Sequence, residues 1–200
     1  MAARGERYLA LGDSFTIGTG TTTDRSFPAG LVARWRAAGR EVALTNPAAN
    51  GYATDELIER ELPLARQLRP TLVTVLAGAN DIVRGSSEER YRDQLRRIYA
   101  GLAEAGVPAT AIYALPQPDW SRSPAAAAFG APRDLLRAIE RFNAIAAEEV
   151  ERAGGAYIDL FPLMRSQAER GLVAPDGLHP SAQAHAEWAA ALERVLRPAR

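Results

Sequence analysis

The sequence predicts an α/β protein in which a parallel sheet is covered by helices on both faces. Short apolar runs alternate with longer segments of helical periodicity along the whole chain. The clearest run, residues 72–76, is apolar and rich in β-branched side chains, as expected of a strand buried on both faces. Strand followed by helix, repeated five times, is typical of a parallel sheet.

Turn-forming residues delimit the first elements. Residues 8–11 are expected to form a strand that ends at Gly12. Residues 27–38 carry apolar side chains at helical spacing and stop before Gly39, which predicts a helix. Residues 41–44 are expected to form the second strand, because an Asn-Pro pair, a turn signal, follows them.

A helix and the central strand come next. Residues 54–68 predict a helix with Thr54 or Asp55 as its cap. Pro63 within this segment indicates a kink or a restart, because proline lacks the N–H that a continuous helix needs. Residues 72–76 are the third predicted strand.

The second half of the chain repeats this alternation. A helix over residues 87–105 precedes a strand over 109–115, and a helix from residue 132 or 133 to 153 precedes a strand over 156–160. Residues 181–196 predict the last helix.

Residues 116–132 form the one long irregular segment between a predicted strand and its helix. The segment holds four prolines and a run of four alanines. A long loop in a compact domain is usually a functional lid or a mobile edge, and a variable surface excursion is the alternative interpretation.

In a parallel sheet, functional groups gather in the loops beyond the carboxyl ends of the strands. Ser14 follows the first strand, where its hydroxyl can act as a nucleophile or can cap a helix. Gly51 follows the second strand in an Asn-Gly turn, where the backbone N–H can approach a ligand closely. Asn80 follows the third strand and can either donate to an oxyanion or close an Asx turn.

The chain has only two histidines. His179 stands in a loop just before the last predicted helix, three residues after Asp176, whose carboxylate can orient the imidazole or cap the turn. His185 falls inside that helix and is expected to be partly exposed. Two imidazoles without cysteines make a poor metal site, so we expect no metal.

Together these loops supply a nucleophile, backbone and amide donors, a base and its orienter, which are the groups that acyl transfer from an ester requires. Four runs of residues resemble, in order and in spacing, the four sequence blocks of the SGNH (GDSL-type) hydrolases: Gly12-Asp13-Ser14-Phe15, a run ending in Asn50-Gly51, Gly78-Ala79-Asn80-Asp81 and Asp176-Gly177-Leu178-His179-Pro180. Phe15 stands where the family's name has leucine, a departure that leaves the catalytic groups untouched.

The resemblance implies a flavodoxin-like three-layer α/β/α sandwich with a five-stranded parallel sheet. It implies a triad of Ser14 as nucleophile, His179 as base and Asp176 as the third member. It also implies an oxyanion hole formed by the N–H of Ser14, the N–H of Gly51 and the side chain of Asn80. The family mechanism is a two-step acyl transfer that needs no cofactor.

Composition restricts the function further. The length of 200 residues predicts one domain that spans residues 1–200. The 24 acidic residues balance the 24 basic ones, and this balance argues against a nucleic-acid partner. The absence of cysteine excludes disulfides, a thiolate nucleophile and Cys-ligated metals. All the basic residues are arginine, so Schiff-base and phosphate-loop lysines are excluded as well.

Within the family, the fold does not determine the substrate. The activity can be that of a lysophospholipase, a thioesterase, a carboxylesterase or a carbohydrate acetylesterase. Short strand-end loops favour a small-molecule ester with a short acyl chain. Arg84 or Arg122 could contact a polar head group, or could be solvated surface.

Two alternatives come from other classes of protein. A non-catalytic binding module on the same scaffold is disfavoured by the complete set of site residues. A dinucleotide binder is disfavoured because Thr23 stands where its glycine fingerprint needs a third glycine after Gly18 and Gly20. No signal peptide and no membrane-spanning run is visible, so a cytoplasmic location is expected, whereas the oligomeric state is not predicted.

Overall fold

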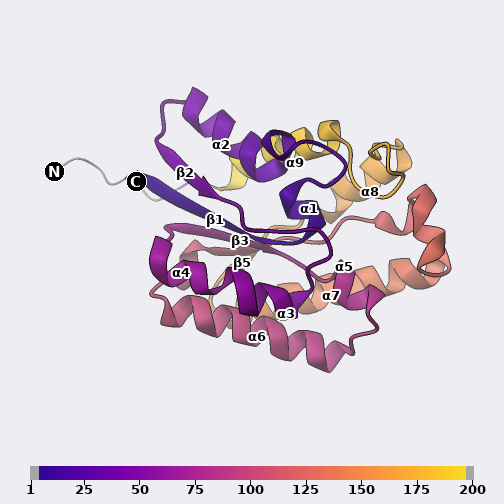
Figure 1. Cartoon of the computed structure of the whole chain (residues 1–200), viewed down its shortest axis with the longest axis horizontal. Helices are drawn as coiled ribbons and strands as arrows, with labels where there is room; N and C mark the ends of the chain where they lie inside the picture. The colour runs from indigo at the N-terminus through magenta and orange to yellow at the C-terminus, as the bar shows by residue number, and fades with distance from the viewer. Residues whose placement is uncertain (1–4, 197–200) are drawn as a thin grey trace.

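The computed structural model describes residues 5–196, which contain a five-stranded sheet in the order β2-β1-β3-β4-β5 with every pair of neighbours parallel (Figure 1). The strands are β1 Glu6–Gly12, β2 Val42–Thr45, β3 Leu72–Leu76, β4 Ile112–Ala114 and β5 Ala156–Tyr157. The predicted parallel sheet is therefore confirmed. Gly12 lies opposite Leu76, so β1 and β3 end together and the loops that follow them start side by side.

Helices cover both faces of the sheet, which confirms the three-layer sandwich (Figure 1). One layer consists of α1 (Ser14–Ile17), α2 (Phe27–Ala37), α8 (Phe161–Glu169) and α9 (Ala182–Val195). The other consists of α3 (Thr54–Glu56), α4 (Pro63–Leu68), α5 (Ala79–Val83), α6 (Glu88–Glu104) and α7 (Pro132–Arg152). In the part of the chain that the structure describes, no helix has the length and apolar character needed to cross a membrane.

The sheet separates two apolar cores, and β1 contributes to both. Tyr8 and Ala10 pack in the core that includes α2 and α9, whereas Leu9 and Leu11 pack in the core that includes α6 and α7. Successive side chains of a strand point to opposite faces, so a strand between two layers must be apolar at every position. This requirement explains the continuous apolar runs in the sequence.

The segment predicted as one helix over residues 54–68 consists of three pieces. A π-helical stretch, Leu57–Glu61, separates α3 from α4, and α4 starts at Pro63, where a missing N–H costs nothing. The restart at Pro63 is therefore confirmed. The predicted cap is wrong, because Ala53 is the N-cap and its N–H donates to the Glu56 carboxylate at 2.8 Å.

Other boundaries also differ from the prediction. The fourth strand is shorter than residues 109–115, because Ala109–Ala111 form a 3₁₀ turn after Pro108. In the predicted fifth strand, residues 156–160, only Ala156–Tyr157 pair with a neighbouring strand. Helices α5 and α8 were not predicted, since each is short and directly follows a strand-end loop.

The segment of residues 116–132 contains two 3₁₀ turns, Trp120–Arg122 and Pro124–Ala128. Gln117, Asp119, Trp120 and Ser121 are buried, so the first part of the segment is packed into the fold. It is neither a mobile edge nor a surface excursion there.

Candidate active site

Ser14 occupies the first position of α1, and one residue, Asp13, separates it from the end of β1. The Asp13 carboxylate caps this helix by accepting the Phe15 N–H at 2.9 Å, which fixes the turn that presents Ser14. Ser14 is only 5% exposed. The structure therefore places this hydroxyl in a defined turn at the carboxyl end of a central strand.

Asp176 and His179 form a hydrogen-bonded pair in a tight loop. A β-bridge between Val173 and Pro180 closes the loop at its base. One carboxylate oxygen of Asp176, Oδ1, accepts the N–H groups of Leu178 at 2.9 Å and His179 at 3.0 Å. The other, Oδ2, lies 2.8 Å from His179 Nδ1. Asp176 thus both caps the turn and orients the imidazole.

The protonation of this pair follows from its hydrogen bonds. Partial burial alone would raise the pKa of Asp176, but the two backbone N–H groups and the imidazole outweigh it, so the pKa of Asp176 is lowered. An ionised carboxylate can only accept, so Nδ1 of His179 carries the hydrogen. The neutral imidazole then has its lone pair on Nε2, as a general base requires.

Two contacts bring the loop of His179 to the turn of Ser14. The ring of Phe15, next to Ser14, lies 5.7 Å from the imidazole of His179, centroid to centroid. Gly20, with a φ of +84°, allows the chain after α1 to approach the pair, because a Cβ there would lie 2.7 Å from Asp176 Oδ2. The segment that starts with Ser14 therefore packs directly on the pair.

The long segment of residues 116–132 supports the same loop from the other side. The hydroxyl of Ser123 donates to the Leu178 carbonyl at 3.0 Å, and the Ala125 N–H donates to the Gly177 carbonyl at 2.9 Å. Residues 123 and 125 therefore restrain the backbone on which His179 stands.

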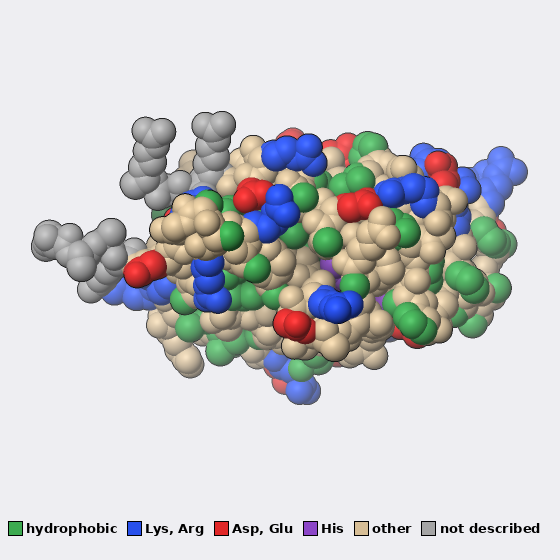
Figure 2. Space-filling view, turned by 90° about the horizontal axis from the view of Figure 1, so that it is seen from above, with side chains coloured by type: hydrophobic (Ala, Val, Ile, Leu, Met, Phe, Trp, Pro, Cys, Tyr) green, Lys and Arg blue, Asp and Glu red, His purple; other side chains and the backbone are tan. Residues whose placement is uncertain are grey.

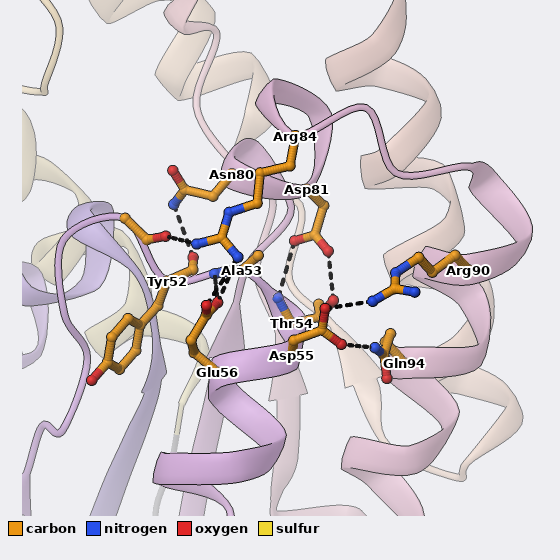
Figure 3. A network of polar contacts seen from close by, with 11 residues as sticks. Tyr52, Ala53, Thr54, Asp55, Glu56, Asn80, Asp81, Arg84, Arg90 and Gln94 are labelled. Carbon is orange, nitrogen blue, oxygen red and sulfur yellow. Dashed lines mark hydrogen bonds and ion pairs between the residues drawn. The ribbon is translucent and has the colours of Figure 1, made fainter.

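Gly51 lies in the predicted turn after β2 and adopts a φ of +83°, with open space where a Cβ would stand. Polar side chains tie its loop to both neighbouring loops. Asn46 Nδ2 donates to the Thr16 carbonyl of α1 at 3.0 Å, and Asn80 Nδ2 donates to the Tyr52 carbonyl at 2.8 Å (Figure 3). The second hydrogen on Asn80 Nδ2 is left for another acceptor.

Ser14 and Asn80 thus lie in the short helices α1 and α5, and Gly51, Asp176 and His179 lie in loops, all at one edge of the sheet. In the part of the chain that the structure describes, no hydrogen bond to a protein acceptor uses the N–H of Ser14 or of Gly51. The space-filling view shows histidine surface at a hollow in one face of the molecule, with acidic and basic side chains interspersed around it (Figure 2). Within residues 5–196, no three His, Asp or Glu side chains are grouped to hold a metal ion.

The prediction that His185 is partly exposed is wrong, because this residue is fully buried. Its Nδ1 accepts the Phe27 N–H at 3.3 Å, and its ring stacks on that of Phe27. Burial lowers the pKa of His185 to about 4, so it stays neutral and serves as packing between α2 and α9.

Two buried carboxyl groups beneath the Ser14 turn had no distinguishing signal in the sequence. Asp13 and Glu61 are both fully buried, and Glu61 Oε2 accepts the Gly12 N–H at 2.9 Å. Burial raises the pKa of Asp13 to about 7. It raises the pKa of Glu61 to about 8, against the opposing Gly12 hydrogen bond and with a further contribution from the charge of Asp13.

The raised pKa of Glu61 makes stability depend on pH. An acid whose folded-state pKa is raised stabilises the fold at low pH, and this contribution is lost as pH rises from about 4.5 to about 8. Glu61→Gln keeps an acceptor for Gly12 and removes the ionisation. We expect it to raise the Tm by about 5–10 °C at pH 9 and to leave it nearly unchanged at pH 4, as thermal unfolding would show.

A matched control for this measurement is Glu59→Gln, in the same π-helical stretch but exposed. It should leave the Tm nearly unchanged at both pH values. An equal Tm difference between Glu61→Gln and the wild type at pH 4 and at pH 9 would contradict the assignment.

Comparison with known proteins identifies the family and the fold. The model of the GDSL-like Lipase/Acylhydrolase family matches residues 10–187. A search of curated proteins found no match.

Several solved structures share the fold. The crystal structure of TesA is 21% identical and superposes with a TM-score of 0.78, covering 96% of this chain and 98% of that one. A lipase/acylhydrolase from Enterococcus faecalis is 20% identical, with a TM-score of 0.77 and coverage of 98% and 99%. An acetyl xylan esterase from Geobacillus stearothermophilus is 18% identical, with a TM-score of 0.77 and coverage of 96% and 94%.

Proposed function

Because this chain belongs to the GDSL-like lipase/acylhydrolase family, we propose that it hydrolyses small acyl esters with Ser14 as nucleophile, His179 as base and Asp176 as orienter. The whole chain then acts as one catalytic domain. The observation that carries the proposal is the Asp176–His179 pair, joined at 2.8 Å and packed on the segment that starts with Ser14.

The chemistry follows from the state of this pair. Nε2 of the neutral His179 takes the proton of Ser14 as Oγ attacks the ester carbonyl, and the ionised Asp176 stabilises the imidazolium that forms. The imidazolium then protonates the leaving alcohol. His179 then deprotonates a water molecule, which attacks the carbonyl of the acyl-serine. The bond between the acyl carbon and Ser14 Oγ breaks, the imidazolium returns the proton to Oγ, and the carboxylic acid leaves.

The oxyanion formed in each step needs donors that are already in place. We assign this role to the N–H of Ser14, the N–H of Gly51 and the remaining hydrogen of Asn80 Nδ2. The contacts of Asn46 with Thr16 and of Asn80 with Tyr52 support the assignment, because they hold the three donors in one rigid frame. Donors held in this way stabilise developing charge without reorganising during the reaction.

The substrate class we propose is an ester with a short acyl chain. The loop that follows β1 is the single residue Asp13, and the loop after β3 consists of Ala77 and Gly78, so neither adds a wall along a long chain. The non-catalytic binding module is not favoured, because a bare binding site has no need of an imidazole oriented by an ionised carboxylate. Lysophospholipase, thioesterase and carbohydrate acetylesterase activities use the same chemistry and are outcomes of the test.

The test is a series of p-nitrophenyl esters from acetate to decanoate. We expect kcat/KM to be highest between acetate and butyrate and to fall by about tenfold or more by decanoate, since a chain without a wall gains little binding energy. Ser14→Ala measures the background. A maximum at octanoate or decanoate would contradict the short-chain proposal. A lysophospholipid, an acyl-CoA and acetylated xylooligosaccharides test the other three substrate classes.

A further inference from the structure

Arg84 lies at the end of α5 and forms hydrogen bonds with the loop that carries Gly51. Its Nη2 donates to the Gly51 carbonyl at 2.7 Å (Figure 3). Its Nη1 lies 2.9 and 3.0 Å from the two carboxylate oxygens of Glu56. The guanidinium is therefore engaged on two sides, although the side chain is 46% exposed.

The same short helix holds Asn80 and Arg84 one turn apart. The Arg84 N–H donates to the Asn80 carbonyl at 2.9 Å, and residues four apart on a helix lie on one face. From that face, Asn80 reaches the carbonyl of Tyr52 and Arg84 reaches the carbonyl of Gly51 (Figure 3). Two successive peptide groups of the loop are thus held by one helix.

Gly51 needs such support. It has no Cβ, its φ is +83°, and open space surrounds the position of the missing Cβ, so side-chain packing does not restrict its backbone. The bond from Arg84 restrains the peptide group between Gly51 and Tyr52, which is joined through the Gly51 Cα to the peptide that carries the Gly51 N–H. Glu56 fixes the guanidinium in turn, and Glu56 is itself held by the Ala53 N–H at 2.8 Å.

We infer that Arg84 is a positioning residue for the oxyanion hole. Arg84 holds Gly51 and Asn80 in register, so that both donate to the same oxygen. This inference rests on the proposed function. Arg84 then acts through Gly51 and does not touch the substrate. Its bonds to Glu56 and Gly51 distinguish it from simple solvated surface, and this positioning role replaces the head-group contact that the sequence left open.

The inference predicts a specific kinetic change. Arg84→Met should lower kcat for p-nitrophenyl butyrate by about 10–30-fold and change KM by less than about twofold, because charge on the carbonyl oxygen develops mainly in the transition state. Labelling by a fluorophosphonate should slow by a similar factor. Arg84→Lys keeps the charge but lacks the planar guanidinium that bonds both Glu56 and Gly51. Its kcat should therefore lie between those of the wild type and Arg84→Met.

The matched control is Arg90→Met. Arg90 is 57% exposed and pairs with Asp55 at 2.6 Å in the same network, but no contact joins it to the Gly51 loop within the described residues (Figure 3). Its kcat should stay within about twofold of the wild type. Melting curves of all variants distinguish loss of folding from loss of rate. If Arg84→Met does not fold, Arg84→Lys takes its place in the kinetic test.

A double-mutant cycle makes the test sharper. If Arg84 and Asn80 serve the same oxyanion, Arg84→Met combined with Asn80→Ala should lose less rate than the product of the two single losses. An unchanged kcat in Arg84→Met, a change confined to KM, or an equal loss in Arg90→Met would overturn the inference. Activity that survives Ser14→Ala would instead overturn the proposed function, whatever Arg84 does.

Discussion

Replacing Ser14 by alanine is expected to lower kcat for p-nitrophenyl butyrate by about 10⁴-fold or more, because the acyl-enzyme cannot form without the hydroxyl. The fold should persist, since alanine fills the small space of the serine and Asp13 still caps α1 through the Phe15 N–H. The melting temperature should therefore stay close to that of the wild type. The measurement is ester hydrolysis by the folded variant.

Covalent trapping reports the same residue directly. A fluorophosphonate reacts readily with a serine that a base activates and whose phosphoryl oxygen finds donors. We expect one adduct per chain, on the peptide that contains Ser14, and none in Ser14→Ala, by intact-mass spectrometry and peptide mapping. Ser86→Ala is the matched control and should label and turn over as the wild type does.

Two outcomes would contradict this assignment. A folded Ser14→Ala variant with wild-type turnover would show that another group is the nucleophile. A wild-type protein that takes no adduct at Ser14, under conditions that label a control serine esterase, would favour the non-catalytic binding module.

His179→Ala should have a comparably large effect, with a loss of about 10⁴-fold or more in kcat, because it removes the proton acceptor for Ser14. Asp176→Asn should also cripple the enzyme, but less severely. The asparagine can still receive the backbone N–H groups at the Oδ1 position, whereas it cannot offset the charge of an imidazolium. Fluorophosphonate labelling should fall sharply in His179→Ala as well.

His185→Gln is the control for the histidine assignment. Because His185 is buried beside Phe27 and bonds its N–H, this substitution is expected to lower the melting temperature and to leave the activity of the folded fraction nearly unchanged. If His185→Gln lost more turnover per folded molecule than His179→Ala, His179 could not be the base.

The sequence by itself determined the class of fold and the order of the site loops. Apolar runs such as residues 72–76 and amphipathic segments such as residues 87–105 are local patterns, and their alternation already required a parallel sheet between two helical layers. Ser14, Gly51 and Asn80 could be located because each follows a predicted strand whose end is marked by turn residues. His179 could be located because it is one of two histidines and stands just before the last predicted helix, three residues after Asp176. Parallel strands present those ends at one edge.

Only the tertiary structure decided which of these groups are in contact and how they are held. The burial of Glu61 depends on β1, far away in the sequence, and a glutamate in a helical segment looks the same whether it is buried or solvated. The bond from Arg84 to the Gly51 carbonyl and the support of His179 by residues 123 and 125 join distant segments, which no local pattern records. Short elements such as α5 and α8 escaped prediction for the same reason, since packing rather than periodicity stabilises helices of this length.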